Sequence, residues 1–130
     1  MALGLSTAEA NSLLTSHTGG TAHTPPAAYW IKLHTGDPGS AGTAAAAANA
    51  TRKQVTWSAA SGGVRSNSAA LTWTTGEVTT NEDYSHWSAW TASTGGTFLA
   101  SGLMTANAVT AGDEFTIPIG DLDLSLNVAA

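Results

Sequence analysis

Alternation of apolar and polar side chains, interrupted by glycine-rich turns, is the feature of this sequence that most limits its fold. From residue 54 onward, short alternating segments recur at intervals of about 8–12 residues, which is typical of an antiparallel sandwich or barrel. In the clearest of these, every second residue from Leu122 to Val128 is Leu or Val. Glycine pairs such as Gly62-Gly63 and Gly95-Gly96 mark turns between segments. The pattern predicts an all-β chain folded as an antiparallel, jelly-roll-like β-sandwich. The predicted strands lie at residues 28–34, 54–57, 68–73, 84–90, 97–104, 114–119 and 122–128.

One segment near the amino end carries helix signals instead. Ser6 is followed by Glu9, which is the spacing of a capping box at a helix start. Gly19-Gly20 then provides a stop signal, because glycine readily leaves the helical conformation. The sequence therefore predicts a short helix over residues 6–16.

The predicted helix has an apolar face that needs a partner. Ala10, Leu13 and Leu14 fall on one side at helical spacing. A helix this short is stable only when such a face packs against something. We therefore expect residues 1–24 to form a helix and connector that act as a docking arm. Residues 25–130 then form the β-sandwich domain.

The first predicted strand is followed by a turn and a long loop. Asp37 and Pro38 lie between two glycines, which predicts a tight turn with Asp37 capping it. Residues 44–48 are all alanine, a composition with high helix propensity. No amphipathic pattern supports a helix there, so residues 40–50 are interpreted as a surface loop with at most one helical turn.

Charge and composition exclude several classes of partner. Only 10% of the residues are charged, the net charge is −5, and the fixed cations are Lys32, Arg52, Lys53 and Arg65. Nucleic acids and anionic membranes bind clustered cations, so we expect neither as a partner. There is no cysteine, no apolar run approaching the about 20 residues that span a bilayer, and no secretory signal at the start. A hydrophobic content of 42%, with five Trp, is too high for a disordered chain.

The residue types that carry catalysis do not assemble into a recognisable motif. His34 and Asp37 lie close to one turn, but further ligands for a metal are not evident nearby. His86 lies among aromatic residues, where a hydrogen-bonded packing role is more common. The carboxylate pairs at 82–83 and 113–114 point to opposite faces of a strand, which is a poor geometry for acid–base work. We expect no catalytic, cofactor or metal site, and no enzyme activity.

The aromatic residues allow two interpretations. Trp57, Trp73, Trp87, Trp90 and Tyr84 are of the type that forms a stacking platform for a sugar ring. Trp57 and Trp73, however, are in phase with apolar neighbours and are therefore predicted to face the core. Trp87 and Trp90 lie three positions apart, so in a regular strand they face opposite sides. One of that pair is predicted to be exposed or to lie in an interface. The docking candidates are Ala10, Leu13, Leu14, Trp87 and Trp90.

Several short motifs follow one another along most of the chain. They include LHTGDPG at residues 33–39, TRKQVTW at 51–57, TGGTFL at 94–99 and IPIGDLDL at 117–124. The sequence resembles a group of small virion proteins of tailed bacteriophages, which are labelled minor tail or tail-fibre proteins and partly resemble capsid decoration proteins. The resemblance implies a structural component of the virion with a β-sandwich knob, and it implies no enzymatic activity.

The resemblance and the residues together give a functional expectation. The chain has no heptads or collagen-like repeat that would form a fibre shaft, which favours capsid decoration over a minor tail protein. Strands poor in charge suit protein interfaces, so we expect a homo-oligomer, most simply a trimer. The expected partners are the major capsid or tail proteins. The expected location is the capsid surface or tail, after synthesis in the host cytoplasm. The alternative is a tail knob that binds a receptor or glycan.

Overall fold

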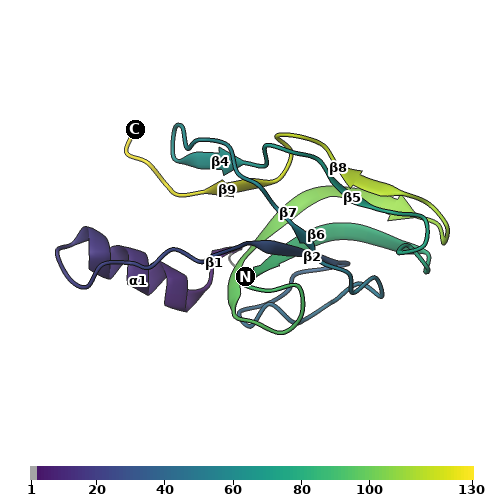
Figure 1. The fold of residues 1–130 in the computed structure, drawn as a ribbon, viewed down its shortest axis with the longest axis horizontal. Helices are drawn as coiled ribbons and strands as arrows, with labels where there is room; N and C mark the ends of the chain where they lie inside the picture. Colours follow the sequence, from purple (N-terminus) through teal and green to yellow (C-terminus); the bar gives the residue numbers. More distant parts are fainter. Residues whose placement is uncertain (1–2) are drawn as a thin grey trace.

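A computed structural model describes residues 3–130 as two layers of antiparallel strands with one helix at the side. The larger layer is a five-stranded sheet in the order β1 (Gly4–Leu5), β7 (Phe98–Val109), β6 (Glu82–Trp90), β2 (Trp30–His34) and β3 (Lys53–Gln54). The second layer consists of two short ladders, β4 (Val64–Ser66) with β9 (Asp123–Ser125) and β5 (Leu71–Trp73) with β8 (Phe115–Ile117). Both ladders lie over the same face of the main sheet (Figure 1). The predicted all-β sandwich with a short amino-terminal helix is confirmed.

The core lies between the two layers. Ile31 and Leu33 of β2 are completely buried, as the alternation in that segment predicts. In β6, Tyr84 and Trp87 both point into the core although they are three positions apart. A register shift between β6 and β7 makes this possible, because it lies between Tyr84 and His86. Trp87 lies directly over Gly102, where a Cβ atom would come within 2.4 Å of the indole.

The helix forms where the sequence predicts it. It is α1 (Thr7–His17), and the Glu9 amide donates a hydrogen bond to the Ser6 hydroxyl at 3.2 Å. The second half of the predicted capping box is absent, because the Ser6 amide donates to the Leu99 carbonyl of β7 at 2.7 Å. Among the described residues, no helix has the length and apolar character needed to cross a membrane.

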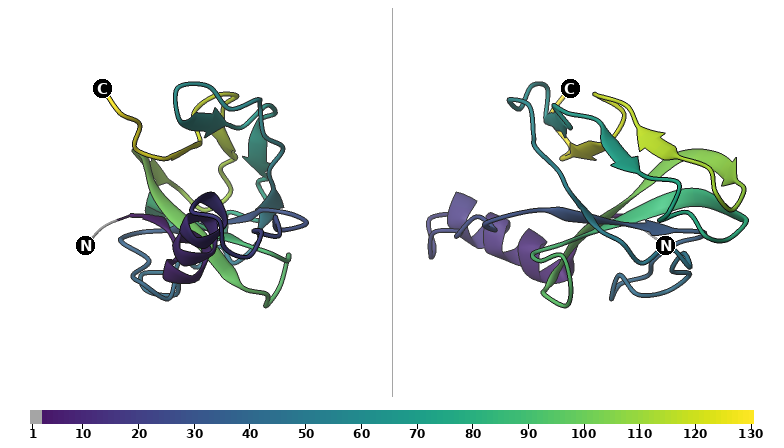
Figure 2. Two further views of the ribbon diagram at one scale, coloured as in Figure 1. Left: turned by 90° about the vertical axis from the view of Figure 1, so that its left-hand side faces the viewer. Right: turned by 45° about the vertical axis from the view of Figure 1, so that its right-hand side comes forward.

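The chain before the helix belongs to the main sheet. In β1, Gly4 pairs with Ser101 and Leu5 with Ala100, and Leu5 packs against the core. The helix itself projects from one end of the sandwich (Figure 2). The proposed docking arm of residues 1–24 is thus anchored in the sheet at residues 4–6, and residues 1–2 lie outside the described part of the chain.

The last predicted strand is much shorter than its sequence pattern. Only Asp123–Ser125 is paired, while Leu126 is 57% exposed and Val128 is 63% exposed. The prediction of a strand through residue 128 is therefore wrong beyond residue 125. The reason is the partner strand β4, which has three residues and begins after the turn at 61–63. β7, by contrast, is longer than predicted: it continues to Val109, whereas the sequence predicts an end at residue 104.

The loop after β2 is held against the sheet. Asp37 caps its turn as predicted, since the carboxylate accepts a hydrogen bond from the Gly39 amide at 2.8 Å. The loop contains no helix, and the Ala47 amide donates to the Leu33 carbonyl at 3.1 Å. Gly42, Ala47 and Asn49 are buried, so the predicted surface loop is not exposed along its whole length. The loop instead covers the end of β2.

Candidate functional site

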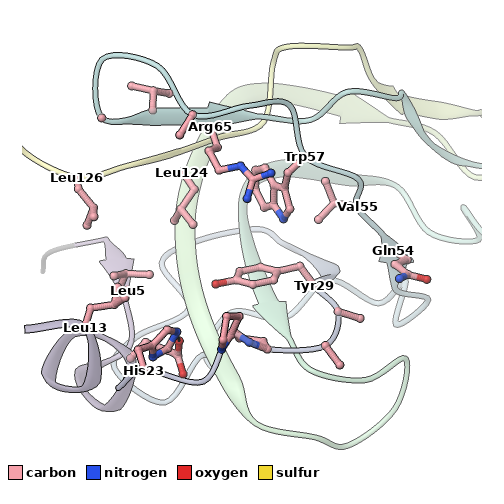
Figure 3. A pocket seen from close by; sticks show the side chains of 18 residues that line it. Leu5, Leu13, His23, Tyr29, Gln54, Val55, Trp57, Arg65, Leu124 and Leu126 are labelled. Atoms are coloured by element: carbon pink, nitrogen blue, oxygen red, sulfur yellow. Dashed lines mark ion pairs between the residues drawn. The ribbon is translucent and has the colours of Figure 1, made fainter. Parts of the chain in front are cut away.

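A cleft of about 480 Å³ opens between α1 with its connector on one side and the β4–β9 ladder on the other (Figure 3). Its floor includes Tyr29 and Trp57, whose rings meet edge to face with centroids 5.6 Å apart. Both rings are partly buried and pack against the core. The volume lies in the range of typical ligand pockets, about 300–1,000 Å³.

Leucines from two distant parts of the sequence form the walls. Leu13 of α1 lines one side, and Leu124 and Leu126 line the other. Leu14, 62% exposed, lies on the same helix. Val128 lies against Gly63 at the wall, where a Cβ atom would meet its methyl group at 2.5 Å. The cleft therefore has an apolar mouth made by the helix and the segment after β9.

Polar groups stand on both walls of the cleft. On the helix side, the His23 Nε2 atom lies 3.8 Å from the Glu9 carboxylate, and its Nδ1 atom is 2.9 Å from the Ser12 hydroxyl. On the opposite wall, Arg65 is the cross-strand neighbour of Leu124. Its Nε atom donates to the Ser58 carbonyl at 2.7 Å. The other guanidinium nitrogens have no hydrogen-bond partner among the described residues.

Charged groups on both walls of the cleft act on the Tyr29 hydroxyl. Burial raises the pKa of the Tyr29 hydroxyl, the Glu9 carboxylate raises it further, and Arg65 lowers it. The Tyr29 hydroxyl is protonated at neutral pH, as tyrosine ordinarily is, and it can donate a hydrogen bond. Together with the Arg65 fork, it makes the cleft suitable for an apolar segment that carries a carboxylate.

The predicted docking residues of the helix lie in different surroundings. Ala10 and Leu13 are partly buried, and Leu13 lines the cleft. Leu14 is largely exposed and does not line the cleft. The face predicted from the sequence is thus divided between the cleft wall and the exposed surface of the helix.

The two tryptophan candidates do not offer a free surface. Trp87 is 1% exposed and belongs to the core, so it is not available to a partner. Trp90 is partly buried, and the Arg52 guanidinium lies 4.6 Å from its ring centroid. Arg52 also donates to the Ala92 and Gly95 carbonyls, at 2.8 and 2.7 Å. Trp90 and Arg52 therefore support the turn between β6 and β7.

A continuous aromatic platform for sugars does not form from the residues considered in the sequence. Trp73, Trp87 and Tyr84 are at most 1% exposed. Trp57 reaches the surface only at the cleft floor, beside Tyr29. The sequence missed Tyr29 and Arg65, because the cleft is built from segments that are far apart in the chain. The only signal for it was the apolar alternation that continues after residue 125.

The histidine considered as a metal ligand has another role. His34 is fully buried, with Nδ1 at 2.8 Å from the Ala44 carbonyl and Nε2 at 2.8 Å from the Ser88 hydroxyl. Asp37 is engaged in its own turn. Within residues 3–130, no group of three His, Asp or Glu side chains gathers in a way that would hold a metal ion.

Comparison with known proteins identifies one family. The family model described as Podophage GP4 fiber I protein gp80 matches residues 4–125. This range includes every strand, the helix and most of the residues that line the cleft. No curated protein matches the chain.

Proposed function

The chain belongs to the family described as Podophage GP4 fiber I protein gp80, and we propose that it is a minor tail protein of the fibre apparatus. Membership in a phage fibre family makes it a structural component of the virion. Its proposed activity is binding, and the proposed binding site is the cleft between α1 and β9. The proposed partners are proteins of the tail.

The apolar mouth of the cleft carries this proposal. Leu126 lines the cleft, Val128 lies against Gly63 at its wall, and both side chains are more than half exposed. Exposed apolar side chains that gather around a hollow are typical of a protein interaction site. The cleft also has few charges, as the centre of a protein interface does. A partner that covers it removes apolar surface from water, which contributes about 25 cal/mol for each Å² buried.

Copy number distinguishes a tail protein from a capsid decoration protein. We expect quantitative mass spectrometry of purified particles to give a few copies, or a few tens, for each virion. Antibody labelling in electron micrographs should then lie at the tail. Hundreds of copies, with label over the shell, would contradict the tail assignment and support capsid decoration.

A matched pair of leucine variants tests the cleft. Leu126 in the cleft wall and Leu103 on β7 have similar exposure, 57% and 65%. We expect Leu126→Asp to fold normally and to be missing from purified particles, because a charge at the mouth opposes apolar docking. Leu103→Asp is the control and should be incorporated like the wild type. Normal incorporation of Leu126→Asp would show that the cleft mouth is not the docking site.

A further inference from the structure

The turn between β8 and β9, residues 118–122, carries an exposed apolar side chain and, two positions later, an exposed carboxylate. Ile119 is 66% exposed, and Asp121 follows two residues later and is also exposed. The Asp121 carboxylate has no hydrogen bond or ion pair within the described residues. We call this turn the knob. An isoleucine in water beside a free carboxylate is a surface that suits a partner with an apolar hollow and a cation.

A buried asparagine fixes the shape of the knob. Asn67 is 1% exposed, and its Oδ1 atom accepts hydrogen bonds from the Gly120 and Leu122 amides, both at 3.0 Å. Its Nδ2 atom donates to the Pro118 carbonyl at 2.9 Å. The knob is therefore held in one conformation before binding. Little conformational entropy remains to be lost on association, which favours affinity.

The cleft offers the chemistry that the knob lacks. Its β4 wall carries the Arg65 guanidinium, and leucines stand beside it. We propose that the knob of one copy docks into the cleft of a second copy, with Asp121 on Arg65 and Ile119 against Leu13 and Leu126. This inference rests on the proposed function, because it names the partner of the same site.

Charge complementarity supports this pairing within the chain. Lys53 is bonded to Glu77 at 2.7 Å, and Arg52 is bonded to two carbonyls. Arg65 is the cation that lines the cleft, and a planar guanidinium binds a carboxylate through two parallel hydrogen bonds. A carboxylate two positions from an exposed isoleucine is the matching counterpart.

The contact joins two copies, and it joins two different surfaces. In its own chain, Asp121 lines a separate groove beside Met104 and Asn107 of β7, not the cleft. A contact between unlike surfaces repeats from copy to copy until a ring closes or a filament grows. A closed ring of three copies agrees with the trimer expected from the sequence.

A charge exchange tests the pairing directly. We expect sedimentation velocity of the full chain, over a series of concentrations, to show a wild-type oligomer. Arg65→Asp and Asp121→Arg should each weaken association by at least about tenfold, since each leaves like charges facing one another. The double variant restores opposite charges and should recover most of the association. Asp83→Arg, at an exposed carboxylate of β6, is the control and should assemble like the wild type.

The outcomes separate this inference from the proposed function. A monomer at every concentration, single variants that assemble normally, or a double variant without recovery would each overturn the knob-and-cleft contact. If the wild type is monomeric while Leu126→Asp is still lost from particles, the cleft binds another virion protein and only the inference fails. If charge exchange behaves as expected but purified particles contain none of the protein, only the proposed function fails.

Discussion

His34 is buried on the face of the main sheet that the loop after β2 covers, yet both ring nitrogens have partners. The Ala44 carbonyl can only accept, so the Nδ1 atom carries the proton of the neutral ring. The Nε2 atom then accepts from the Ser88 hydroxyl, and Ser88 in turn accepts from the Trp90 indole at 2.8 Å. The network ties the loop, β2 and β6 together while the imidazole stays uncharged.

This arrangement makes stability depend on pH. Burial lowers the pKa of His34 below its ordinary value of 6.5, the Ala44 carbonyl opposes this, and the Lys32 charge lowers the pKa further. The unfolded chain therefore binds a proton more readily than the folded one. The free energy of unfolding is at its full value above pH 6.5 and falls as the pH drops through that value.

We expect His34→Gln to flatten the dependence of stability on pH between about pH 5 and 7, because the variant lacks the titrating group. Urea unfolding at a series of pH values measures this slope. His17→Gln, at the exposed end of α1, is the matched control and should keep the wild-type slope. A His34 variant with the same slope as the wild type would show that another group is responsible.

At the scale of elements, the sequence predicts what local signals determine. The start of α1 depends on Ser6 and the Glu9 amide, which are close in the chain, and it was predicted correctly. The length of β9 depends on β4, about 60 residues away, and the alternation from Leu122 to Val128 contains no information about that partner. The register shift in β6 is of the same kind, since it depends on pairing with β7.

The candidate site follows the same rule. Leu13, which lines the cleft, is predictable as a surface candidate because a helical face is visible in a short stretch of sequence. Tyr29 and Arg65 are not predictable in this way, because they meet only after the second layer has folded over the main sheet. Alternation alone makes Trp87 a docking candidate, because it cannot show which tryptophan of the pair is inside.

Removing the amino-terminal segment tests where the docking arm begins. Deletion of residues 1–18 removes β1 together with α1, and therefore removes the Leu5 packing and the Ser6–Leu99 hydrogen bond. We expect a loss of about 2 kcal/mol, from a few hydrogen bonds and part of a buried leucine. Thermal unfolding followed by circular dichroism measures it. Leu14→Asp keeps β1 and should unfold close to the wild type. Equal transitions in the deletion and the wild type would instead show an arm independent of the sandwich.

For the whole molecule, the sandwich is closed at one end and open at the other. Under the β5–β8 ladder, Phe115 packs on Trp73 and Tyr84, with ring centroids 5.7 and 5.0 Å apart. Trp73 is fully buried, and its indole donates to the Thr51 carbonyl at 2.8 Å. Under the β4–β9 ladder the layers separate, and the cleft replaces the core. One end therefore stabilises the fold, and the other is left for binding.

A series of leucine substitutions in and around β9 measures how packing weakens from the closed core to the open cleft. Leu122 is 1% exposed, Leu124 is partly buried and Leu126 is 57% exposed. We expect Leu122→Ala to cost about 2–5 kcal/mol, since it leaves a cavity in a packed core. Leu124→Ala should cost about 1 kcal/mol, because less apolar area is lost from the interior. Leu126→Ala should stay within about 0.5 kcal/mol of the wild type. Trp73→Ala, at about 3–5 kcal/mol, gives the reference for the closed end. Urea unfolding of dilute protein gives the change in free energy of unfolding for the four variants. Equal costs for the three leucines would mean that the segment from Leu122 to Leu126 packs as one strand and that the cleft is closed.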